Sequence, residues 1–114
     1  EDEEGVREMV SETLETYGYQ VLKAEDPKQG LEIASANSSG IDLLLTDIIM
    51  PVMNGKELYK QLHAIFPGTK VLYMSGYTDN MIVPDGILKE GTNYLQKPFS
   101  IRKLTQKVRK VLDE

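Results

Sequence analysis

Residues 41–47, with the sequence IDLLLTD, decide the fold of this chain. The first six of these residues, 41–46, form a compact apolar run that is rich in leucine, the turn-forming sequence Ser38-Ser39-Gly40 precedes this run, and Asp47 follows it. Such a run is typical of a strand that is covered on both faces. Working outward from this strand, we expect further strands at residues 20–25, 70–74 and 93–96.

Helical periodicity fills the intervals between these strands. Apolar residues between positions 6 and 17 share one face of a first helix, and Gly18 is its natural stop. Asp26 is the expected N-cap of a second helix, with Pro27 in its first turn. A third helix at 56–66, a short and weak one at 83–90, and a last helix from about Ser100 complete the pattern.

The alternation of strands and helices predicts the fold class. It implies right-handed crossovers and a mostly parallel sheet. We therefore predict one α/β domain, residues 1–114, of the doubly wound class, with helices on both faces of the sheet. Ligands of this class bind beyond the carboxyl ends of the strands, so functional residues are sought there.

Composition excludes several kinds of function. The chain has 114 residues, a formal net charge of −5 and only 13 Lys and Arg, which argues against direct nucleic-acid binding. It contains no Cys, so a disulfide framework, a thiol nucleophile and a Cys-based zinc site are excluded. No apolar run approaches the roughly 20 residues that span a bilayer. We expect no membrane contact by this domain.

Reactive side chains stand just beyond the expected strand ends. Asp47, Ser75 and Lys97 follow three strands, and Glu1-Asp2 precede the first helix. Clustered carboxylates repel one another unless a cation neutralises them, and Mg²⁺ takes one or two carboxylates while leaving positions for phosphate oxygens. Asp47 can then attack phosphorus, while Lys97 and Ser75 stabilise the oxygens of the transferring group.

Four stretches of the sequence resemble the receiver domain of response regulators. They are Glu1-Asp2-Glu3, LLLTDIIMPVMNG ending at Gly55, VLYMSGYTD ending at Asp79, and NYLQKPF ending at Phe99. Together they span almost the whole chain in the order of that family. The resemblance implies a flavodoxin-like sheet with strand order 2-1-3-4-5.

The resemblance also implies a phosphoacceptor site with Mg²⁺ as cofactor. Asp47 matches the residue that takes a phosphoryl group from a phosphohistidine, and Ser75 and Lys97 match the residues that contact this group. Three groups match the metal ligands: the Asp2 carboxylate, the backbone carbonyl of Ile49, and Glu1 acting through water, in addition to Asp47.

Two further features follow from the resemblance. Tyr94 matches an aromatic switch residue that moves inward with Ser75, and the Lys97–Pro98 peptide bond is expected to be cis. Phosphorylation of Asp47 is then expected to change a binding face. This face is formed by residues 83–90, the strand of Tyr94 and the last helix.

Partners and context are implied in the same way. The expected partner is a histidine kinase or a histidine phosphotransfer domain, the expected location is cytoplasmic, and the expected state is a monomer or a weak dimer. The wording YMSGYTDN and QKPF is most similar to receivers of hybrid sensor histidine kinases. The resemblance leaves two contexts open, a hybrid histidine kinase whose parent chain could be membrane-anchored, and a stand-alone regulator. The domain itself is expected to be a phosphoacceptor and not a turnover enzyme.

One departure concerns the first strand. The family places a central strand before its acidic pair, whereas this sequence starts at Glu1-Asp2. Loss of a central strand exposes sheet edges and opens the core. We expect this strand to be missing or truncated in the given sequence, with either upstream residues or a strand swapped from a neighbouring chain filling the gap.

Two alternative functions stay open. A degenerate receiver would act only as a protein-interaction module. An aspartate-nucleophile phosphatase would need a second Asp two residues after Asp47, where this chain has Ile49. Pro51 and Gly55 are interpreted as turn formers. Ile49 and Tyr77 are apolar or aromatic residues expected to obstruct water, which predicts slow hydrolysis of a phosphorylated Asp47.

Overall fold

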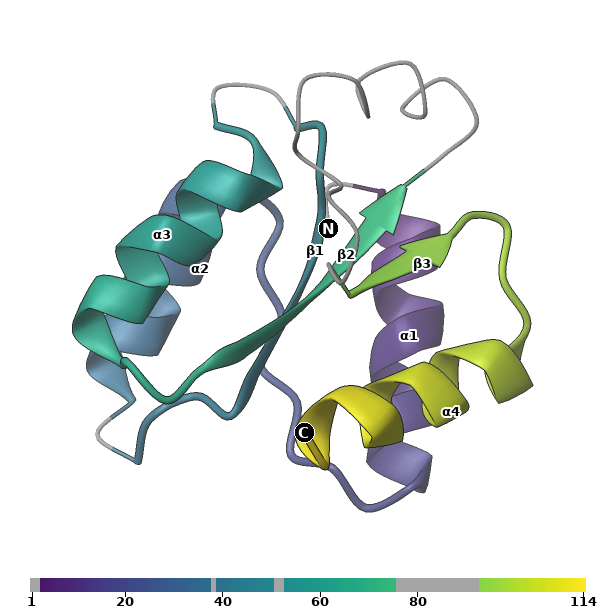
Figure 1. Cartoon of the computed structure of the whole chain (residues 1–114). Helices are drawn as coiled ribbons and strands as arrows, with labels where there is room; N and C mark the ends of the chain where they lie inside the picture. Colours follow the sequence, from purple (N-terminus) through teal and green to yellow (C-terminus); the bar gives the residue numbers. More distant parts are fainter. Residues whose placement is uncertain (1–2, 38, 51–52, 76–92) are drawn as a thin grey trace.

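The computed structural model describes residues 3–37, 39–50, 53–75 and 93–114. Within them, three strands, β1 (Leu43–Asp47), β2 (Lys70–Ser75) and β3 (Tyr94–Gln96), form a sheet in the order β1-β2-β3. Both pairings are parallel, with Asp47 beside Met74 and Ser75 beside Gln96 (Figure 1). The parallel sheet predicted from the sequence is confirmed, and its carboxyl edge carries Asp47 and Ser75.

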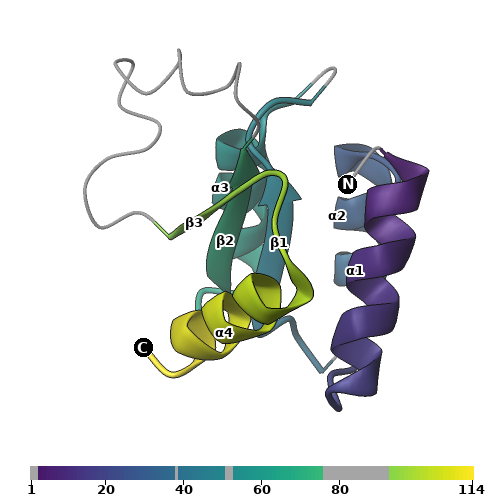
Figure 2. The same ribbon diagram turned by 90° about the vertical axis from the view of Figure 1, so that its right-hand side faces the viewer.

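Four helices cover the two faces of this sheet. They are α1 (Glu4–Thr16), α2 (Pro27–Ala36), α3 (Gly55–Ile65) and α4 (Ile101–Leu112). Figure 1 shows α2 and α3 on one face and α1 and α4 on the other, and Figure 2 is turned so that α1 and α4 lie toward the viewer. None of these described helices combines the length and apolar character that crossing a membrane requires.

The helices begin where local sequence provides caps. The Asp26 side chain accepts a hydrogen bond from Gln29 N at 2.8 Å, as predicted, and Pro27 occupies the first turn of α2. The Asn54 side chain caps α3 in the same way through Glu57 N. Gly18, just after α1, has φ 94°, a left-handed conformation that costs glycine little.

The main core lies between the sheet and the helices α1 and α4. It is made of apolar side chains that are at most 7% exposed: Val10, Leu14, Leu72, Leu95, Leu104, Val108 and Val111. Burial of this surface supplies the main favourable term in folding, at about 25 cal/mol per Å² of apolar area. It fixes α1 and α4 on the sheet and so holds the carboxyl edge in place.

The strand predicted at residues 20–25 is wrong for the described structure. These residues run between α1 and α2 without forming a strand. Their alternating pattern is local, whereas a strand also requires a neighbouring backbone to pair with. In the strand order implied by the resemblance, that neighbour is the first strand of the family. The helix predicted at residues 83–90 lies outside the described residues.

Candidate functional site at the carboxyl edge of the sheet

Asp47 is the last residue of β1 and, among the residues that the structure describes, the one buried acidic residue. It is 5% exposed, and its place at the strand end follows from the apolar run before it. Burial of a carboxylate is costly unless a positive charge or hydrogen bonds compensate for it. A buried aspartate at this position therefore requires a specific environment.

Lys97 supplies that positive charge, and it directly follows β3, the strand at the opposite edge of the sheet from β1. Its Nζ lies 2.5 Å from Asp47 Oδ1, with the two side chains 23% and 7% exposed. The backbone positions it further, since Lys97 N donates a hydrogen bond to Ser75 O at 2.6 Å. The Lys97–Pro98 bond is cis, which confirms the expectation drawn from the sequence.

Ser75 lies between these two residues at the end of β2. It is fully buried, with an exposed fraction of 0%. The register places Met74 beside Asp47, so Ser75 is one residue further along the carboxyl edge. The structure thus brings together the three residues predicted to contact a phosphoryl group: an anion, a cation and a hydroxyl.

Gly55 holds the loop after β1 close to the site. A Cβ on this residue would lie 2.1 Å from the carbonyl oxygen of Asp47, which is far inside contact distance. Gly55 N donates to Ile48 O at 2.7 Å, and Ile48 N donates to Met74 O at 3.0 Å. The sequence interpretation of Gly55 as a turn former missed this role. Glycine is required at position 55 because the backbone there lies close to the end of β1. This contact depends on the folded structure, and sequence spacing does not reveal it.

Of the remaining predicted residues, the structure describes Ile49 and Tyr94 but not Glu1, Asp2 or Tyr77. The Ile49 side chain is 46% exposed, beside the site and two residues after Asp47. Tyr94 is half-buried on β3, and its hydroxyl donates to Gln96 Oε1 at 2.7 Å. Glu1, Asp2 and Tyr77 lie outside the described residues. Among the described residues, no group of three or more acidic or histidine side chains forms a metal cluster.

Sequence reasoning also missed Tyr73, in the middle of β2. It is 5% exposed and pairs in register with Thr46 on one side and Tyr94 on the other. Burial, and to a lesser degree the neighbouring Tyr59, raises the pKa of its hydroxyl from 10.0 to about 12. The sequence feature that could have indicated the burial of Tyr73 is its central position in a predicted strand.

Comparison with known proteins identifies the family. The model of the response regulator receiver domain matches residues 1–109. The chain belongs to the response regulator receiver domain family.

Curated relatives place this receiver domain in proteins of different length. It is 31% identical over 112 residues to the response regulator receiver protein CpdR of Brucella abortus, covering 98% of this chain and 92% of CpdR. It is 30% identical over 114 residues to the sensor kinase CckA of the same organism, covering 100% of this chain but 12% of CckA. The match therefore spans nearly all of one relative and a small part of the other.

Solved structures agree with the fold of this receiver domain. The receiver domain of the hybrid histidine kinase CckA matches with a TM-score of 0.80 and 32% identity, covering 98% of this chain and 94% of that chain. The chemotaxis protein CheY4 of Vibrio cholerae matches with a TM-score of 0.82 and 30% identity, covering 97% and 92%. The chain is thus a receiver domain of two-component signalling, and phosphoryl acceptance is what this family implies.

Proposed function

We propose that Asp47 is the phosphoacceptor of this receiver domain and that the domain is a phosphorylation-dependent signalling switch. The observation that carries the proposal is the 2.5 Å contact between Lys97 Nζ and Asp47 Oδ1 at the carboxyl edge of the sheet. A lysine held against a buried carboxylate keeps the carboxylate ionised, which is the form that attacks phosphorus.

The proposed donor is a phosphohistidine on a histidine kinase or a histidine phosphotransfer domain. An Asp47 oxygen forms a bond to phosphorus as the bond between phosphorus and the histidine nitrogen breaks, and the imidazole leaves with the electron pair and takes up a proton. Lys97 is placed to neutralise charge on the phosphoryl oxygens, and the buried Ser75 hydroxyl to donate a hydrogen bond to one of them. Positioning and charge neutralisation are most of what such a transfer requires.

We propose a magnesium ion as the cofactor of this site. Asp47 provides a carboxylate at the carboxyl edge, and Mg²⁺ prefers one or two such ligands with water and phosphate oxygens in the other positions. We propose Asp2, the Ile49 carbonyl and Glu1 through water as the remaining ligands. The ion supplies positive charge to the phosphoryl oxygens when it is bound.

Intact mass after incubation with acetyl phosphate tests this function. We expect one phosphoryl adduct on the wild type with Mg²⁺, no adduct after chelation of the metal, and none on Asp47→Asn. Asp42→Asn is the matched control, because Asp42 is exposed and lies just before the same strand. An adduct that persists in Asp47→Asn would place the phosphoryl group elsewhere. No adduct on folded wild type would favour the degenerate interaction module.

We propose that Tyr94 responds to the phosphoryl group as a switch. Its ring lies on β3, next to the strand that ends in Ser75, and its hydroxyl is held by Gln96 in this structure. The phosphatase alternative has no support at position 49, because an exposed isoleucine side chain cannot transfer a proton.

A further inference from the structure

Gln96, the last residue of β3, links the aromatic side chain next to it on the strand to the functional site. Its Oε1 accepts a hydrogen bond from the Tyr94 hydroxyl at 2.7 Å, and its Nε2 donates to the backbone carbonyl of Lys97 at 3.5 Å. Both bonds are partly buried. Gln96 therefore joins the tyrosine proposed as a switch to the lysine that contacts Asp47.

The two partners fix the orientation of the Gln96 amide. A backbone carbonyl only accepts hydrogen bonds, so the NH₂ group of Gln96 must face the carbonyl of Lys97. The amide oxygen is then turned toward Tyr94, whose hydroxyl donates to it. A flipped amide would bring two carbonyl oxygens together at Lys97. Tyr94 is thus held by an acceptor whose direction is set by a residue of the functional site.

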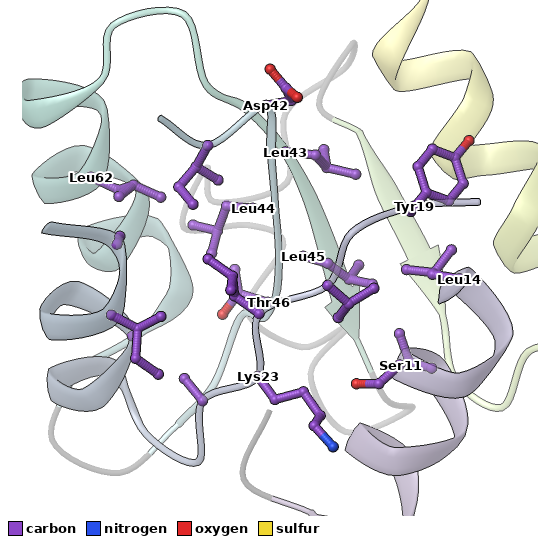
Figure 3. A pocket seen from close by; sticks show the side chains of 18 of the residues that line it. Ser11, Leu14, Tyr19, Lys23, Asp42, Leu43, Leu44, Leu45, Thr46 and Leu62 are labelled. Carbon is purple, nitrogen blue, oxygen red and sulfur yellow. The ribbon is translucent and has the colours of Figure 1, made fainter. Parts of the chain in front are cut away.

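Strand geometry places Tyr94 and Gln96 on the same face of β3. Side chains alternate along a strand, so both point to one face and Leu95, between them, points to the other. Leu95 is 4% exposed and belongs to the core with α1 and α4, which fixes the backbone of β3. The pair lies at the opposite edge of the sheet from the pocket beside β1 (Figure 3), and neither residue lines that pocket.

From Lys97 the contacts continue to the phosphoacceptor proposed above. Lys97 N donates to Ser75 O at 2.6 Å, and Lys97 Nζ lies 2.5 Å from Asp47 Oδ1. The sheet register also pairs Ser75 directly with Gln96. A displacement of Lys97 or of the end of β2 therefore reaches Gln96 through residues that contact it directly.

The two hydrogen bonds of Gln96 differ in strength. The bond from the Tyr94 hydroxyl, at 2.7 Å, has the usual length for two oxygens, whereas the 3.5 Å bond to the Lys97 carbonyl exceeds the usual N–H···O length of about 2.9 Å. A small displacement of the Lys97 backbone would break the longer bond first. The amide would then lose the contact that orients it and would be free to turn away from Tyr94.

We propose that Gln96 is a positioning residue that holds Tyr94 in the conformation of the unphosphorylated domain, and that loss of its bond to Lys97 releases Tyr94. The inference rests on the proposed function, with Asp47 as phosphoacceptor and Tyr94 as switch. When Asp47 carries the phosphoryl group, Lys97 Nζ contacts a phosphoryl oxygen instead of the carboxylate, and its backbone moves with it. One neutral hydrogen bond shifts an equilibrium between two conformations by about fivefold.

NMR of the tyrosine rings measures the conformation of Tyr94. The chain has six tyrosines, and Tyr94→Phe identifies the Tyr94 signal in protein labelled with ¹³C-tyrosine. For the wild type we expect one signal position alone and another with acetyl phosphate and Mg²⁺, while intact mass shows whether an adduct has formed. Gln96→Leu removes the acceptor. Without phosphorylation, its Tyr94 signal should move toward the phosphorylated position, by an amount that corresponds to a change of about fivefold in the equilibrium.

Gln96→Glu and Gln106→Leu are the matched controls. Glutamate keeps an oxygen that accepts from the Tyr94 hydroxyl, so the Tyr94 signal of the unphosphorylated variant should stay at the wild-type position. Gln106 is exposed on α4, the helix that packs against the opposite face of β3 through Leu95. The same change to leucine at this position should leave the Tyr94 signal unchanged. Urea unfolding checks that each variant is folded.

The possible results separate this inference from the function on which it rests. An adduct on the wild type, together with equal Tyr94 signals in unphosphorylated wild type and Gln96→Leu, would overturn the inference and leave the phosphoacceptor proposal standing. A Gln96→Glu signal displaced as far as that of Gln96→Leu would also overturn it, because an acceptor oxygen would then not be what holds the ring. No adduct on folded wild type would overturn the proposed function, and the inference with it.

Discussion

Lys97 reaches Asp47 across the full width of the described sheet. Lys97 follows β3, Asp47 ends β1, and β2 lies between them, yet Lys97 Nζ is 2.5 Å from Asp47 Oδ1. Two strand spacings separate the backbones by about 10 Å, so only a long side chain spans the gap. Because it passes beyond the end of β2, this ion pair lies at the edge where Ser75 is buried.

Removal of the Lys97 charge should slow the phosphorylation of Asp47. Lys97→Met keeps an apolar stem but leaves the Asp47 carboxylate without this cation. We expect the rate of labelling by acetyl phosphate to fall by about 100-fold, the usual effect of losing one group that stabilises a transition-state oxygen. Lys103→Met, an exposed change on α4, is the control and should label at the wild-type rate. Equal rates in both variants would remove Lys97 from the reaction.

A methyl group at Gly55 should destabilise the domain. The Cβ of Gly55→Ala would lie 2.1 Å from the Asp47 carbonyl oxygen, so the loop or the end of β1 must shift. We expect a loss of about 2 kcal/mol in the free energy of unfolding, measured with urea. Gly68→Ala is the matched control, because a Cβ there has nothing within 4 Å, and its stability should change by less than about 0.5 kcal/mol. A Gly55→Ala protein as stable as wild type would mean that the loop relaxes freely.

Local sequence predicted those features of the fold that depend on neighbouring residues. The cap at Asp26 is set within one turn of its helix, and the residues of β1 carry enough apolar character to require burial. The strand expected at residues 20–25 failed because pairing depends on a distant segment. The site residues also divide into those that could be predicted from the sequence and those that depend on contacts formed only in the folded chain. Asp47, Ser75 and Lys97 were predictable from strand ends and family motifs, whereas the close approach of Gly55 depends on how the loop returns.

Tyr73 should give the domain a specific sensitivity to alkaline pH. Burial raises its pKa from 10.0 to about 12, so the folded state holds the proton more tightly than the unfolded state. Its contribution to stability is complete below about pH 10 and is lost as the pH rises toward about 12. At about pH 11 this loss is roughly 1.4 kcal/mol, which Tyr73→Phe should abolish.

Urea unfolding at about pH 9 and about pH 11 measures this difference for the wild type and two variants. Tyr17→Phe is the control, since Tyr17 is 60% exposed and should retain the full alkaline loss. If Tyr73→Phe loses as much stability as the wild type over this interval, the tyrosine hydroxyl is not the group that titrates.

Ile49 should prolong the life of the phosphorylated state, if Asp47 is the phosphoacceptor as proposed. Its side chain is 46% exposed beside the strand end, where an apolar group hinders the approach of water to phosphorus. An Ile49→Asn variant, alone or with Tyr77→Glu, should lose the phosphoryl adduct faster than the wild type, as followed by intact mass after the donor is removed. Ile65→Asn is the matched control, because Ile65 is 45% exposed but lies at the far end of α3. Faster loss from the wild type than from Ile49→Asn would contradict a shielding role, because the exposed isoleucine would then not be what slows hydrolysis.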